Sequence, residues 1–155
     1  MRIVVVGIGN VLMGDDGFGV VVVEKLRRLN LPVDIYEFGT LGIQILNFIE
    51  GYDLCILIDT VRGGKDPGEI YVFDMDEVDF NLRNPISLHD VGFVEALKLC
   101  GFCFNLPRIV VVGVEPERID FGVGLSKVVK SVIPKVIKIV VGIVDEMMNT
   151  PAPEM

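Results

Sequence analysis

The sequence predicts an α/β fold built on one mixed β-sheet. Short runs of β-branched residues recur along the chain, helix-length segments separate most of them, and one connection is too short for a parallel crossover. The chain has 155 residues, of which 51 % are hydrophobic. A chain of this size buries about 70 % of its unfolded surface around one core. We therefore expect a single domain over residues 1–148.

Five runs rich in Val and Ile are predicted to be the strands of this sheet. The link "TVRGGKDPG" between the third and fourth runs is shorter than the roughly dozen residues that a parallel crossover needs. The fourth strand is therefore expected to run antiparallel to the third. The predicted strands are Ile3–Val6, Val33–Glu37, Leu54–Asp59, Glu69–Phe73 and Ile109–Val114.

Four segments are predicted to be helices, namely Gly17–Leu29, Leu41–Glu50, Val91–Leu99 and Ser126–Met148. The last of them repeats Val and Ile at spacings of three and four residues, which is typical of an amphipathic helix. Two features oppose these helices. The stretch "VVVVEKL" has poor helix propensity, and Pro134 is expected to kink or split the last helix. The Pro-rich end "NTPAPEM", residues 149–155, is expected to fray.

The charge and cysteine content exclude several classes of protein. The net charge is −8 and the longest basic cluster is "LRRL", so the electrostatic requirement for binding nucleic acid is missing. Three cysteines without a disulfide framework indicate a reducing compartment. The longest apolar stretch, "VIPKVIKIVVGIV", is interrupted by Lys135 and Lys138 and is too short to span a membrane. We expect a cytoplasmic protein without a membrane partner.

The loop "GIGNVLMGDDGFG", residues 7 to 19, follows the first strand and has glycine spacing typical of phosphate-binding loops. In the dinucleotide-binding pattern a third glycine is needed where this chain has Leu12. Glu37 still matches the acid that binds the ribose, so a Rossmann-like nucleotide-binding oxidoreductase stays as an alternative.

Two acids in this loop oppose the binding of phosphate. Asp15 and Asp16 stand where a P-loop has Lys and Ser or Thr, and their charge repels an anion. The P-loop interpretation is therefore rejected. The loop lies at the carboxyl end of the first strand, where open α/β sheets bind their ligands. Its charge favours a cation instead.

Two more residues are expected near the same edge of the sheet. Asp59 ends the apolar run "LCILIDT", and His89, the only histidine, precedes a predicted helix in "PISLHDVG". Two carboxylates and one imidazole form an open three-ligand site that suits zinc or nickel. Each residue also has a simpler explanation, because Asp15 or Asp16 can cap the first helix, Asp59 can cap a turn and His89 can be an ordinary loop residue.

The motif "CGFC", from Cys100 to Cys103, has the spacing of a thioredoxin redox pair. In redox proteins the first cysteine begins a helix, which lowers its pKa. Here the pair follows a predicted helix, where the helix dipole opposes a thiolate. We therefore expect buried structural thiols.

Five motifs together, "GIGNVLMGDDGFG", "GTLG", "LIDT", "SLHDVG" and "VGVEPE", closely resemble the hydrogenase maturation protease family. The resemblance spans residues 1 to about 148. It implies a three-layer α/β/α fold of the phosphorylase/hydrolase-like kind, with a five-stranded mixed, mostly parallel sheet. It also implies that Asp16, Asp59 and His89 contact a metal and serve in catalysis.

The family resemblance further implies the reaction. Such endopeptidases remove the C-terminal extension of a nickel-iron hydrogenase large-subunit precursor after nickel insertion, and the nickel carried by the substrate is the recognition signal. Gly39, Thr40 and Gly42 are expected to give backbone room for the substrate tail. Glu37-Phe38 replaces the family's usual Asp-Gly before this loop. No nucleotide is implied. A metal-binding chaperone without peptidase activity is the remaining alternative.

Overall fold

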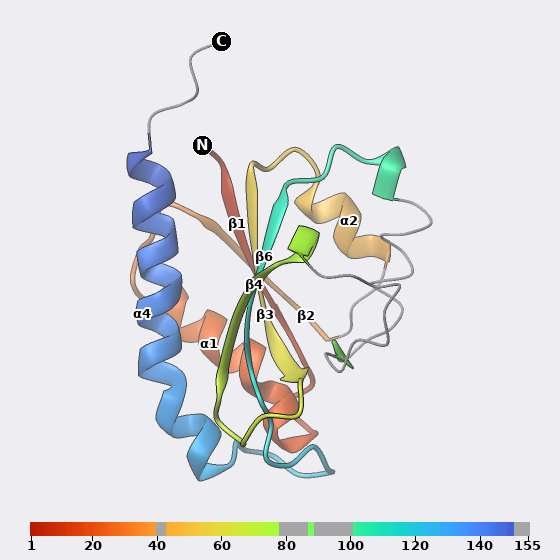
Figure 1. Cartoon of the computed structure of the whole chain (residues 1–155), viewed down its shortest axis with the longest axis vertical. Helices are drawn as coiled ribbons and strands as arrows, with labels where there is room; N and C mark the ends of the chain where they lie inside the picture. Colours follow the sequence, from red (N-terminus) through yellow and green to blue (C-terminus); the bar gives the residue numbers. More distant parts are fainter. Residues whose placement is uncertain (40–42, 78–86, 89–100, 151–155) are drawn as a thin grey trace.

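The computed structural model describes residues 1–39, 43–77, 87–88 and 101–150. Its sheet follows the strand order β2–β1–β3–β6–β4, and a short β5 pairs with β3 beside this path (Figure 1). The first three strands in chain order are parallel to one another and to β6, whereas β4 is antiparallel to β6. The strands are β1 (Ile3–Ile8), β2 (Asp34–Phe38), β3 (Leu54–Arg62), β4 (Ile70–Asp74), β5 (Ser87–Leu88) and β6 (Arg108–Val114).

The predicted mixed sheet is confirmed. The fourth predicted strand does run antiparallel to the third, although β6 lies between them. One boundary matters for the site. The sequence placed Asp59 at the end of its strand, but β3 continues to Arg62 because Thr60 pairs with Val114 of β6 and Val61 pairs with Leu88 of β5.

Helices cover both faces of the sheet, so the predicted three-layer arrangement is confirmed. Helices α1 (Phe18–Arg27) and α4 (Lys127–Asn149) pack on one face, and α2 (Ile43–Ile49) packs on the other (Figure 1). Along β1, Val5 packs in the hydrophobic core beneath α1 and α4, whereas Val4 and Val6 pack in the core beneath α2. Burial on both faces explains the continuous apolar run of this strand.

Tertiary packing overrides the weak helix propensity of two segments. In α1, Val22 and Val23 are fully buried in the core. Helix α4 continues through Pro134, so the expected split is wrong. A proline inside a helix costs about 3 kcal/mol, whereas each buried Val or Ile side chain contributes roughly 1.5–3 kcal/mol. The buried side chains of α4 are Val129, Ile133, Val136, Val140 and Val144.

Several expected segments lie wholly or partly outside the described residues. The helix expected at Val91–Leu99 falls within 89–100, and the first residues of the helix expected at Leu41–Glu50 fall within 40–42. Of the end that was expected to fray, Asn149 closes α4 and residues 151–155 are not described. Three 3₁₀ turns in the described residues, η1 (Gly14–Gly17), η2 (Met75–Glu77) and η3 (Gly101–Cys103), were not predicted. In the described part of the chain, no helix has the length and apolar character needed to cross a membrane.

Helix α1 packs unusually close to the sheet because it carries a glycine in its first turn. A Cβ atom added to Gly19 would lie 2.5 Å from the carbonyl oxygen of Ile58 and closer still to that of Ile8. These are backbone atoms of β3 and β1, which cannot move aside without displacing the sheet. The glycine therefore lets α1 pack directly against the carboxyl end of β1 and the middle of β3.

We predict that Gly19→Ala lowers the free energy of unfolding by about 1–3 kcal/mol, because the added methyl group overpacks a rigid backbone contact. Gly142→Ala is the matched control on α4, where a Cβ atom meets nothing within 4 Å. This control is expected to raise stability by roughly 0.5–1 kcal/mol through helix propensity. Urea unfolding curves of both variants measure the difference. Equal stability of the two variants would contradict the close contact at Gly19.

Candidate active site

The glycine-rich loop after β1 folds back on the end of its own strand. Gly9 has φ +153°, and a Cβ atom there would overlap the carbonyl oxygen of Asp16. Gly14 has φ +57°, and a Cβ atom added to it would lie 2.9 Å from the carbonyl oxygen of Arg118. Such backbone conformations favour glycine. These two glycines let the backbone pack closely around the 3₁₀ turn η1 (Gly14–Gly17), which contains Asp15 and Asp16.

Asp15 is a structural residue that holds the loop before α4. Its side chain is fully buried, and Oδ2 accepts hydrogen bonds from the backbone N–H of Glu117 (2.9 Å) and of Arg118 (3.0 Å). The backbone N–H of Ser126 donates to Oδ1 (2.7 Å) and its hydroxyl donates to Oδ2 (2.9 Å). Ser126 is the N-cap of α4. Asp15 therefore fixes the start of α4 against η1.

The simpler explanation of the two acids as caps of the first helix is wrong. The N-cap of α1 is Gly17, and no side chain caps it by a hydrogen bond. The residue before η1, Met13, also provides no side-chain cap. Asp15 and Asp16 are nevertheless both buried. Their burial needs another explanation.

Asp16 and Asp59 are two buried carboxylates at the same edge of the sheet. Only 4 % of Asp16 is exposed, and its Oδ2 accepts a hydrogen bond from the backbone N–H of Asn10 at 3.0 Å. Asp59 is fully buried, and its Oδ1 accepts from the backbone N–H of Thr60 at 2.7 Å. Asp59 follows Ile58, whose carbonyl contacts the first turn of α1 next to η1. Buried carboxylates at the carboxyl edge of a sheet are typical of functional sites.

The remaining predicted site residues are only partly described. His89, Thr40 and Gly42 lie outside the described residues, so their predicted roles stay predictions. Gly39 is described and has open space at its Cβ position. Within the described ranges, no group of three or more His, Cys, Asp or Glu side chains is positioned to hold a metal ion. A cleft of about 400 Å³ opens beside Gly39. It is lined by Gly9, Asn10, Val11, Val20, Glu37, Phe38 and Gly39.

Glu115 is a buried acid whose role the sequence did not reveal. Its Oε1 accepts hydrogen bonds from the backbone N–H of Gly63 (3.0 Å) and of Lys65 (2.9 Å) and from the hydroxyl of Tyr71 (2.7 Å). Burial and this bond to Glu115 raise the pKa of the Tyr71 hydroxyl. Glu115 therefore holds the turn that follows β3. The signal was the acid at the end of the apolar run in "VGVEPE", which repeats the pattern of Asp59.

The cysteines do not form a catalytic centre in the described part of the chain. Burial raises the pKa of Cys55 to about 12, which keeps its thiol protonated. Cys103 is exposed in η3, so the expectation of a buried thiol is wrong for this residue. The reason is that the segment after Gly101 packs only partly against the sheet, through Phe104 and Leu106. Cys100 lies outside the described residues.

We predict that Asp15→Asn destabilises the fold by about 2 kcal/mol or more, because an amide places a donor where backbone N–H groups need an acceptor. The exposed acid Asp145 of α4 provides the matched control, since Asp145→Asn makes the same change of charge. The control is expected to stay within about 0.5 kcal/mol of the parent protein. Thermal and urea unfolding measure the stability of both variants. An Asp15→Asn protein as stable as the control would contradict the structural role of the Asp15 hydrogen bonds.

Comparison with known proteins identifies the family. The hydrogenase maturation protease family, HycI, matches residues 20–143. The hydrogenase expression/formation protein HupD of Rhizobium leguminosarum bv. viciae is 38 % identical over 143 residues, which cover 88 % of this chain and 71 % of HupD. The hydrogenase 2 maturation protease of Escherichia coli K12 is 35 % identical over 138 residues, covering 86 % of this chain and 84 % of that protein.

Solved structures agree with this result. The hydrogenase maturating endopeptidase HybD of Escherichia coli superposes with a TM-score of 0.83 and 31 % identity, covering 95 % of this chain and 94 % of HybD. The [NiFe] hydrogenase maturation protease HybD of Thermococcus kodakarensis gives a TM-score of 0.80 at 27 % identity, covering 93 % and 99 % of the two chains. The family model that covers residues 20–143 and the relatives that are 35–38 % identical show that this chain belongs to the hydrogenase maturation protease family.

Proposed function

We propose that this protein is an endopeptidase that removes the C-terminal extension of a nickel-iron hydrogenase large-subunit precursor. The observation that carries the proposal is the burial of Asp16 and Asp59 at one edge of the sheet, where Asn10, which lines the cleft at Gly39, donates a backbone hydrogen bond to Asp16. Membership of a protease family favours hydrolysis over the nucleotide-dependent redox chemistry that the glycine spacing also suggested. The relatives in Escherichia coli are a hydrogenase 2 maturation protease and a maturating endopeptidase, which supports this class of substrate.

The proposal makes nickel a part of the substrate. Asp16 and Asp59 supply two carboxylates, and His89, which follows β5 in the sequence, is proposed as a third ligand. Three protein ligands leave coordination positions open, and the groups on the precursor that already hold the nickel fill them. Mixed imidazole and carboxylate ligands suit a borderline divalent ion. Nickel in the precursor then acts as the signal that insertion is complete. The reaction is proposed to take place in the cytoplasm.

Two mechanisms use the same residues. In the first, Asp16, Asp59 and His89 hold the nickel of the substrate where it polarises the scissile carbonyl or a water molecule. In the second, one carboxylate accepts the proton of the attacking water, as in an aspartic protease. Burial strengthens either effect, because charges interact more strongly away from bulk water. Gly39, Thr40 and Gly42 leave backbone room for the extended tail of the substrate.

We predict that Asp16→Asn and Asp59→Asn each lower the rate of precursor cleavage at least about 100-fold, because each keeps the side-chain volume but removes the charge that binds a cation or accepts a proton. Cleavage is followed by mass spectrometry of the precursor. Cys103→Ser, a change at an exposed thiol, is the control and is expected to retain activity.

Circular dichroism and thermal unfolding of the two Asp variants show whether they keep the fold. A folded Asp59→Asn protein with the activity of the parent would refute the assignment of this carboxylate. Loss of activity in the Cys103→Ser protein, with both Asp variants still active, would instead support cysteine chemistry.

A nickel-loaded precursor is predicted to be shortened, whereas the nickel-free precursor stays intact, because the open ligand set of the protease needs the metal that the substrate brings. Both forms are incubated with the protein and their masses are compared. Equal cleavage of the nickel-free form would exclude nickel as the recognition signal. Binding of the loaded form without any shortening would identify a metal-binding chaperone in place of a protease.

A further inference from the structure

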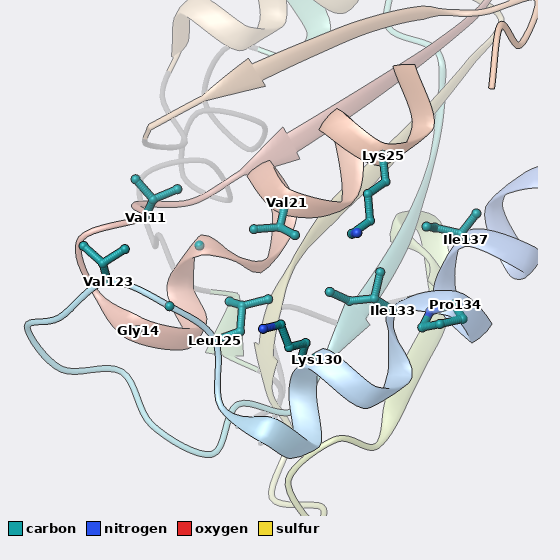
Figure 2. Close-up of a pocket in the computed structure, with 12 residues that line it drawn as sticks. Val11, Gly14, Val21, Lys25, Val123, Leu125, Lys130, Ile133, Pro134 and Ile137 are labelled. Carbon is teal, nitrogen blue, oxygen red and sulfur yellow. The ribbon is translucent and has the colours of Figure 1, made fainter. Parts of the chain in front are cut away.

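A large apolar groove lies between α1 and α4, on the face of the sheet opposite to α2. Its volume is about 700 Å³. Val21 of α1 and Ile133 and Ile137 of α4 form its walls, and Leu125 lies at the end near η1 (Figure 2). No part of the mechanism proposed above uses this groove.

Exposed apolar side chains continue from the groove onto two neighbouring loops. Val11 is 44 % exposed and Leu12 51 %, and on the other loop Phe121 is 87 % and Val123 82 % exposed. The two loops are joined by backbone hydrogen bonds from Gly14 N–H to Gly122 O (2.8 Å) and from Gly122 N–H to Leu12 O (2.8 Å). The apolar residues are therefore held on an ordered platform. Exposed apolar side chains on neighbouring ordered loops are typical of a protein interaction site.

Two lysines give the groove a charge opposite to that of the whole protein. Lys25 of α1 and Lys130 of α4 line the groove and extend their side chains toward the space between the helices (Figure 2). Neither side chain forms an ion pair with a described residue. The protein as a whole carries a net charge of −8. The net charge of the protein repels an anionic partner, whereas these two lysines favour the binding of a carboxylate in this groove.

The groove adjoins the turn that carries Asp16 and shares one lining residue with the cleft at Gly39. Val11 lines both the groove and the cleft at Gly39. Gly14 and Gly17, the two ends of the turn that carries Asp16, also line the groove. A chain bound in the groove therefore passes directly beside the turn that holds a proposed catalytic carboxylate.

We propose that this groove is a docking site for the folded body of the substrate precursor, separate from the tail that is cleaved. This inference rests on the proposed function. The occupant is a surface segment of the precursor with apolar side chains for the groove and at least one carboxylate for Lys25 and Lys130. The exposed apolar residues of the two loops favour a protein substrate. Val11 lines both the groove and the cleft at Gly39, so a segment bound in the groove also directs the tail toward the cleft.

The test uses the nickel-free precursor, which is expected to dock without being cleaved, so that its dissociation constant is measurable at equilibrium. The double variant Lys25→Glu/Lys130→Glu reverses the charge of the groove with two exposed residues. Lys135→Glu/Lys138→Glu makes the same change of net charge on exposed positions of α4 outside the groove. The groove variant is expected to bind about tenfold more weakly than the parent, and the control within about twofold.

Three outcomes would overturn the docking site, and they differ in what they say of the proposed function. Equal binding by the groove variant and the control, with normal cleavage of the nickel-loaded precursor, rejects the groove alone. A parent protein that neither binds nor cleaves either precursor rejects both proposals. Sedimentation that reveals a dimer, abolished only by the groove variant, assigns the groove to a second copy of this chain.

Discussion

The close contact between α1 and the two central strands is the constraint on which the rest of the structure depends. The helix approaches so closely because Gly19 has no side chain to separate it from the carbonyl oxygens of Ile8 and Ile58. The preceding turn η1 is thereby held at the carboxyl edge of the sheet, with Gly9 packed against the carbonyl of Asp16. Every later feature of the candidate site uses this placement.

The two adjacent acids of η1 illustrate how one turn supports both fold and chemistry. Asp15 receives hydrogen bonds from the backbone N–H groups of three residues and from one hydroxyl, and it joins η1 to the start of α4. Asp16 faces the loop of Asn10 at the edge where Asp59 is also buried. A carboxylate held in this way positions its neighbour, because the backbone of the turn cannot shift without breaking the bonds of Asp15. Glu115 has a comparable role for the turn after β3.

The sequence predicted the features that depend on local pattern. The β-branched runs identified the strands because the central strands are buried on both faces of the sheet, and the spacing of Val and Ile identified α4 because one face of that helix is buried. It failed where distant segments decide the outcome. The extension of β3 depends on its pairing with β5, the continuity of α4 through Pro134 depends on packing, and the bonding of Asp15 depends on residues more than a hundred positions away. The exposed position of Cys103 has the same origin, since no local pattern sets the packing of η3.

The proposed function depends on contact between the carboxylates of Asp16 and Asp59 and a metal ion that the substrate brings to this edge of the sheet. X-ray absorption at the nickel K edge measures this most directly, with the nickel-loaded precursor frozen alone and in complex with the protein. We expect additional oxygen or nitrogen ligands on nickel in the complex, and their partial loss when Asp16→Asn or Asp59→Asn replaces the parent protein. A nickel spectrum that is identical with and without the protein would show that neither carboxylate contacts the metal.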